Sequence, residues 1–139
     1  IMSINKSKIK NIQASGISVL TSKTDIANAR IVFEDNCVCN LSSSRISDKI
    51  ERKMRVFQKN SYFSLDYQNS SLGTYKKIKN KNAVSIEKKE KSFPQNDSLK
   101  DEIDSFVKCI KNNKKAVVDA SDGLNALTYA LKISNLIKK

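Results

Sequence analysis

The chain has 139 residues, 39% hydrophobic and 29% charged, a balance typical of a folded globular domain and not of a disordered or membrane protein. A chain of this length can bury one hydrophobic core, so we expect a single domain over residues 1–139. The net charge of +12 comes almost entirely from lysine, which favours a solvated basic surface over a nucleic-acid site, because arginine is the side chain that clamps phosphates and reads bases.

The first two thirds of the chain have the alternation typical of β-strands. Residues 9–20 predict one strand with a bend near Gly16. Apolar and polar residues alternate through 27–33 and again through 37–41, and the turn between these segments predicts an antiparallel hairpin. Four further short strands are expected at 54–57, 62–66, 74–78 and 83–87. Lysines around the last two indicate edge strands, which like charges protect from pairing with other chains.

From Leu99 the period changes to that of a helix, with Asp97 or Ser98 as its cap. After an extended link, a second helix capped by Ser121 is expected to run to Ile137 and, being apolar on most sides, to be heavily buried. Strands followed by two helices predict the α+β class, as an open, mainly antiparallel sheet with the helices packed on one face. The other face then needs a partner or a polar coat.

Few residues suggest chemistry. There is no histidine, the usual general base, so the chain alone is a poor candidate enzyme. The three cysteines lack the spacing and the partners of a zinc site or a disulfide framework, and we expect small buried thiols. Asp101, Glu102 and Asp104 suit a solvated first helical turn better than a metal site. We therefore assign no catalytic, cofactor-binding or metal-binding residue.

An aromatic cluster near Arg55 offers a second interpretation of the basic charge. Tyr62, Phe63 and Tyr67 could form an aromatic and basic surface for single-stranded nucleic acid. Alternate strand residues point to opposite faces, however, so packing in the core is the favoured interpretation. No apolar run is long enough for a signal peptide or a membrane span, and we expect a cytoplasmic protein without a membrane partner.

Two segments in this order resemble the C-terminal domain of the Gfo/Idh/MocA family of NAD(P)-dependent oxidoreductases. They are the hairpin from Asp25 to Arg45 and the ending from Leu99 to Leu127, and the resemblance extends over most of the chain. Asn36 stands where the family has a glycine in the hairpin turn, and asparagine also tolerates a left-handed backbone. Ala116 and Asn113 replace a proline and a glycine that are common in the family.

The resemblance implies a substrate-binding and oligomerisation domain. The intact protein would use NAD or NADP to oxidise a hydroxyl of a sugar, inositol or nucleotide sugar. Because the Rossmann domain that carries the cofactor and the catalytic lysine is not in this sequence, and the chain starts at Ile1, we expect a missing upstream part and an inactive isolated chain. Copies would pair through the open sheet face as a homodimer or tetramer.

Arg45 is the one candidate for substrate binding. At the end of a strand, its guanidinium could hold a sugar phosphate or carboxylate bidentately, and the alternative is a structural ion pair. The competing function for the whole chain is a stand-alone or remnant interaction module that dimerises and binds anionic partners through its basic surface.

Overall fold

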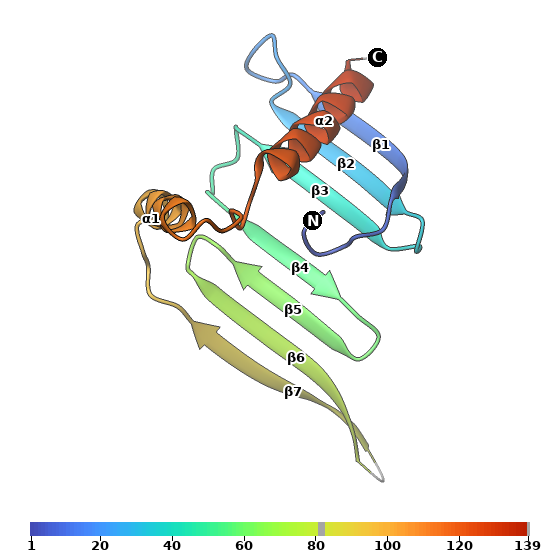
Figure 1. The fold of residues 1–139 in the computed structure, drawn as a ribbon. Helices are drawn as coiled ribbons and strands as arrows, with labels where there is room; N and C mark the ends of the chain where they lie inside the picture. Colours follow the sequence, from blue (N-terminus) through green and yellow to red (C-terminus); the bar gives the residue numbers. More distant parts are fainter. Residues whose placement is uncertain (81–82, 139) are drawn as a thin grey trace. The chain divides into compact units, whose positions relative to one another are not determined.

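The structure, a computed structural model, describes residues 1–80 and 83–138. Its strands form two sheets in which all neighbours are antiparallel (Figure 1). The first sheet contains β1 (Ile9–Ile17), β2 (Ile26–Phe33) and β3 (Val38–Ser44). The second contains β4 (Lys53–Phe57), β5 (Ser61–Asp66), β6 (Ser71–Asn80) and β7 (Ala83–Ser92). The helices are α1 (Ser98–Lys111) and α2 (Ala120–Ile137).

This arrangement confirms the α+β class with antiparallel strands. The hydrogen bonds divide the strands into a three-stranded and a four-stranded sheet, where the sequence suggested one. The chain likewise separates into two compact units, Ile1–Ser47 with Cys109–Lys139, and Asp48–Lys108. A single domain over residues 1–139 stays a prediction.

The core of the first unit lies on one face of its sheet. Ala29, Ile31 and Phe33 of β2 alternate with exposed residues and are buried, which is the period of two that predicted the strand. The register places Ile12 and Cys39 on either side of Ile31, so the core face extends over all three strands. This apolar face specifies the register, because a slip by one residue would turn the buried side chains to solvent.

The opposite face of this sheet is polar. Arg30 donates a hydrogen bond from Nη1 to Asn40 Oδ1 at 3.2 Å, and Ser42 donates from its hydroxyl to Asn28 Oδ1 at 2.8 Å. These pairs stand directly opposite each other in the register of β2 and β3. Cross-strand hydrogen bonds of this kind stabilise the pairing of β2 and β3 and leave a polar surface on the outer face.

The hairpin turn and the irregularity of β1 refine the sequence predictions. Asn36 has φ 64, so it does adopt the left-handed backbone expected of the glycine position. The register of β1 shifts between Ile9 and Asn11, not near Gly16. Gly16 pairs regularly with Ala27, so the glycine is not needed for a bend. Its contact with α2 explains why a glycine is present.

Helix α2 packs against β1 at close range (Figure 1). A Cβ on Gly16 would lie 2.7 Å from Cγ2 of Ile137, the last residue of the helix, and 2.7 Å from Cγ2 of Thr24. Ala14 and Ala29 are directly paired on the same core face as Gly16, so the side chains beside this contact are also small. The absence of a side chain at Gly16 therefore lets the end of α2 approach the sheet.

Two sequence predictions for α2 were wrong. Its cap is Asp119, whose carboxylate accepts hydrogen bonds from the backbone of Ser121 and Asp122, while Asp122 bonds back to the amide of Asp119. Asp is as good a cap as Ser, and this reciprocal pair needs the acid at the third helical position. The helix also has no buried residue. Its apolar residues lie on two sides, and only one side meets the sheet.

The side of α2 that leaves the sheet forms an exposed stripe of Leu124, Leu127 and Leu131. These residues are spaced by three and four, so they lie along one line of the helix. Tyr129, Ile133 and Ile137, spaced by four, are the half-buried ones. We call the three leucines the α2 stripe.

The second unit follows the predicted pattern with longer strands. β6 and β7 each extend several residues beyond the expected segments. β7 is at the edge of its sheet, as its lysines indicated, but the same prediction for β6 was wrong, because β6 pairs with β5 on one side and β7 on the other. Asp97 caps α1 by accepting hydrogen bonds from the amides of Leu99 and Lys100. The helix is followed by Asn113, which has φ 50. No residue of α1 is buried.

The cysteines are less buried than the sequence suggested. Cys37 is exposed, and Cys39 and Cys109 are partly buried. Desolvation raises the pKa of Cys39. Among the described helices, none is both long and apolar enough to span a membrane.

We predict that Gly16→Ala destabilises the fold by about 1–3 kcal/mol, because the new methyl group would force Ile137 or Thr24 to move. Urea unfolding measures this change. Gly123→Ala is the matched control: nothing lies within 4 Å of the added Cβ, so it should stabilise α2 by about 0.5–1 kcal/mol. A Gly16→Ala variant as stable as the wild type would refute the close approach.

Candidate functional site

Asp25 is the most tightly held polar residue of the first unit. It directly precedes β2, and its side chain is fully buried. The carboxylate oxygen Oδ2 accepts hydrogen bonds from the amides of Val19, Leu20 and Thr21 at 2.8, 2.8 and 3.0 Å. The other oxygen, Oδ1, accepts from the Thr21 hydroxyl at 2.9 Å. One carboxylate thus organises the loop between β1 and β2.

Arg45, the residue predicted to bind substrate, lies beside this carboxylate. Its Nε is 3.2 Å from Asp25 Oδ1, and Nη2 donates a hydrogen bond to the carbonyl oxygen of Thr24. The structure therefore shows the ion pair that the sequence left as the alternative role. The Arg45 side chain is still 52% exposed, so part of the guanidinium faces solvent. Its role in substrate binding stays a prediction.

The hydrogen bonds explain the electrostatics of Asp25. Hydrogen bonds from the amide of Thr21, which has the largest effect, and from the amide of Val19 hold the pKa of this carboxyl well below its usual range. Together they outweigh the desolvation, which raises the pKa. The carboxylate is therefore ionised at every pH at which proteins normally work. Its role is to hold the loop and to position Arg45, and a group held so firmly in one charge state is unsuited to moving protons.

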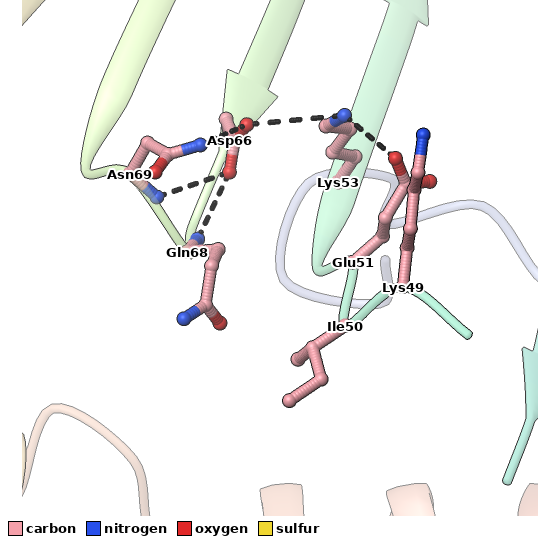
Figure 2. A pocket seen from close by; sticks show the side chains of 7 residues that line it. All are labelled: Lys49, Ile50, Glu51, Lys53, Asp66, Gln68 and Asn69. Atoms are coloured by element: carbon pink, nitrogen blue, oxygen red, sulfur yellow. Dashed lines mark hydrogen bonds and ion pairs between the residues drawn. The ribbon is translucent and has the colours of Figure 1, made fainter. Parts of the chain in front are cut away.

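A second polar site lies within the second unit, at one end of its sheet (Figure 2). It is an open hollow of about 300 Å³. Its lining comes from the segment before β4, from β4 itself, from the end of β5 and from the turn that follows: Lys49, Ile50, Glu51, Lys53, Asp66, Gln68 and Asn69.

Lys53 connects the two sides of the hollow. Its Nζ lies 3.0 Å from Glu51 Oε1 and 4.0 Å from Asp66 Oδ2 (Figure 2). Asp66 is held in turn by the amides of Gln68 and Asn69, at 3.0 and 3.1 Å from Oδ1, and by the Asn69 side chain at 3.0 Å from Oδ2. Lys53 and Asp66 are opposite each other in the register of β4 and β5, so the sheet itself brings them together.

The charges of the hollow are fixed by these contacts. The hydrogen bond and charge of Glu51 raise the pKa of Lys53, and the same bond lowers the pKa of Glu51. The Asn69 side chain and amide lower the pKa of Asp66. All three groups stay charged near neutral pH, so they are suited to binding polar hydroxyls or amides and not to proton transfer.

The sequence did not single out Glu51, Lys53 or Asp66. The signal that was present is the turn sequence after Asp66, where an aspartate followed by polar residues commonly binds its own downstream amides. The partnership with Lys53 depends on strand register, which sequence spacing alone does not fix. Within residues 1–80 and 83–138, no group of three or more metal-binding side chains is placed to hold an ion.

We predict that the stability of the wild type falls as the pH drops below about 4, the usual aspartate pKa. Above that pH the depressed folded-state pKa of Asp25 stabilises the fold fully, and below it the unfolded chain takes up a proton that the folded chain still excludes, which favours unfolding. Asp25→Asn should be less stable at neutral pH and should lose less stability on acidification. Unfolding by urea across this pH range measures both. Asp48→Asn, the same charge change at an exposed position, is the control and should keep the wild-type slope.

Comparison with known proteins finds relatives by sequence and by structure. No family model matches the chain. UDP-N-acetylglucosamine 3-dehydrogenase from Acidithiobacillus ferrooxidans is 26% identical to it over 125 residues, which cover 88% of this chain and 40% of that protein. The chain thus spans well under half the length of this curated relative.

Solved structures give the same picture of the fold. Two structures of UDP-N-acetylglucosamine 3-dehydrogenase GnnA from Acidithiobacillus ferrooxidans match 98% of this chain with TM-scores of 0.88 and 0.83 at 24% identity, over 43% and 42% of their own length. Levoglucosan dehydrogenase in complex with NADH matches 84% of this chain and 39% of its own, with a TM-score of 0.67 and 10% identity. These structural likenesses establish the fold alone. Together with the sequence match, they show that the chain is related to part of a sugar dehydrogenase, with a coverage that fits its C-terminal domain.

Proposed function

We propose that the chain is the substrate-binding domain of an NAD(P)-dependent oxidoreductase of the Gfo/Idh/MocA type, acting on a hydroxyl of a nucleotide sugar together with a nucleotide-binding domain. The observation that carries the proposal is the sequence match over 125 residues to a UDP-N-acetylglucosamine 3-dehydrogenase. The shared fold over 98% of the chain supports it.

The residues of this chain do not fit a dinucleotide site. Such a site needs a glycine-rich turn between a strand and a helix. The three glycines here lie apart, with Gly16 against α2, Gly73 within β6 and Gly123 within α2. NAD or NADP, the group that exchanges hydride in such enzymes, would therefore be held by the other domain, and this chain would bind and orient the sugar.

Arg45 and the polar hollow are the features suited to that role. The exposed part of the Arg45 guanidinium can add a phosphate or carboxylate while Asp25 holds its Nε. The hollow offers amide groups and fixed charges of both signs, which can hydrogen-bond to sugar hydroxyls. The two sites belong to different units, and each is proposed on its own chemistry.

Apolar surface supports the need for a partner. The α2 stripe is exposed, and so are Val117 and Val118 just before the helix. Exposed apolar surface of this kind commonly marks a surface that another domain or chain covers. We propose that a neighbouring domain or a second copy covers the α2 stripe, and that the intact protein forms a homodimer or tetramer.

We predict that the DNA directly upstream of the Ile1 codon encodes a βαβ unit with a Gly-x-Gly-x-x-Gly turn, in frame or across a stop. Sequencing and translating that region in all frames checks this. An upstream region without such a unit in any frame would count against the proposed enzyme.

In a two-domain protein with this unit, UDP-N-acetylglucosamine and NAD⁺ should produce NADH. Arg45→Lys keeps a cation beside Asp25 but loses the planar fork, so it should raise KM about tenfold or more while the fold stays intact. NADH absorbance measures the kinetics, and urea unfolding controls for stability. An unchanged KM would leave Arg45 with the structural ion pair alone.

The α2 stripe yields a separate prediction for the chain alone. Leu127→Asp should change the free energy of unfolding by no more than about 0.5 kcal/mol, because the side chain is exposed. Ile133→Asp, on the side facing the sheet, should destabilise by about 2–4 kcal/mol. Urea unfolding of both variants measures the contrast. Equal losses of stability would show that the stripe is packed within this chain.

A further inference from the structure

Three aromatic rings stand in a row across the second sheet. The rings of Phe57 and Tyr62 are stacked with centroids 4.6 Å apart and planes inclined by 15°, and those of Tyr62 and Tyr75 are stacked at 5.0 Å and 29°. The ammonium group of Lys88 lies 5.9 Å from the centroid of Tyr75 and closes the row. One residue comes from each of the four strands of the sheet.

The register explains why the row forms. Phe57 pairs with Tyr62, Tyr62 with Tyr75, and Tyr75 with Lys88, so all four side chains point to the same face. The neighbouring position in β6 is Gly73, whose missing side chain leaves room for Tyr75: a Cβ there would be 3.1 Å from the ring. Phe57 begins the row on the edge strand β4 and is 75% exposed.

Basic side chains flank the row on the same face. Arg55 is two residues before Phe57, and Lys77 and Lys79 are two and four residues after Tyr75, so strand alternation places them with the rings. No ion pair of these three cations occurs among the residues that the structure describes. Glu90, an acid on this face, is paired with Lys88 at 2.8 Å. We call these rings and cations the aromatic-basic face.

The structure corrects the sequence interpretation of this region. Tyr62 and Arg55 do share a face, while Phe63 points to the other side of the sheet with the half-buried Val56. The rings that join Tyr62 are Phe57 and Tyr75, which lie on other strands. The sequence favours core packing over an aromatic and basic surface of Tyr62, Phe63 and Tyr67. The structure instead gathers Phe57, Tyr62 and Tyr75 on one face with Arg55.

We propose that the aromatic-basic face binds single-stranded nucleic acid. The exposed ring of Phe57 provides a stacking surface for a base, and Arg55, Lys77 and Lys79 lie where they can contact the phosphates on either side of the row. Stacking on aromatic side chains combined with a basic surface is how proteins bind single strands without sequence preference. This proposal does not depend on the proposed enzyme function.

Charge favours this occupant over a second copy of the chain. A symmetric dimer through this face would bring together two copies of one surface, both of them positively charged. The carboxylates on the face are few, and Glu90 and Asp66 already have basic partners in Lys88 and Lys53. Like charges brought together in an interface oppose association, whereas a polyanion neutralises them.

The test is binding of a fluorescently labelled oligothymidylate of about fifteen nucleotides, followed by fluorescence anisotropy at low and rising salt. The full chain should bind at low salt and release the strand as salt increases. Phe57→Ala changes no charge and removes the free stacking surface, so it should weaken binding about tenfold. Circular dichroism checks that this exposed position leaves the fold unchanged.

A matched pair of double variants separates a site from general attraction. Arg55→Ala with Lys77→Ala, and Lys89→Ala with Lys91→Ala, change the net charge equally, but the second pair lies on the opposite face of the sheet. The first should weaken binding and reduce the salt slope by about one unit for each phosphate that the protein no longer neutralises. The second should do so much less.

Several outcomes would overturn the proposal. They are no binding at low salt, equally weakened binding in the two double variants, and duplex DNA bound as tightly as the single strand. Light scattering tests the competing occupant: a dimer that Phe57→Ala converts to a monomer, without oligonucleotide binding, would assign the face to a second copy.

Discussion

The buried carboxylate of Asp25 fixes the point where the three strands of the first sheet meet. Its side chain accepts hydrogen bonds from amides of the loop after β1. Its own amide donates to the carbonyl oxygen of Ile17 at the end of β1, and its carbonyl oxygen accepts from the amide of Arg45 after β3. The Arg45 side chain returns to the same carboxylate. Because a buried charge is tolerated only when its partners are in place, this one residue couples the loop to both strand ends.

The sequence was informative where structure depends on local pattern. Alternation located the hairpin of β2 and β3, and the change of period located both helices, because both signals arise from which side chains face the core. The cap of α2 was missed because Asp119 and Ser121 are both good caps, and only the reciprocal bond of Asp122 decides between them. The burial of α2 was overestimated because composition gives how many apolar residues a helix has, not how many meet a neighbour.

The candidate sites were harder to predict because they depend on register. Arg45 was identified from its place at a strand end, but its partner Asp25 lies twenty residues earlier in the chain. Lys53 with Asp66, and Phe57 with Tyr62 and Tyr75, meet only once the strands of the second sheet are aligned. Each of these groupings crosses strands, and a shift of one residue would have dispersed it to opposite faces.

The lysines of β7 limit how copies of the chain can associate. Lys88, Lys89 and Lys91 alternate across both faces of this edge strand, so an identical strand aligned parallel and in register beside it would set ammonium group against ammonium group on either face. Continuous parallel, in-register extension of the sheet from this edge, a common geometry of fibrous aggregates, is therefore disfavoured. Pairing of two copies through the open backbone of β7 would need an antiparallel or staggered register that sets these lysines against Glu87 and Glu90.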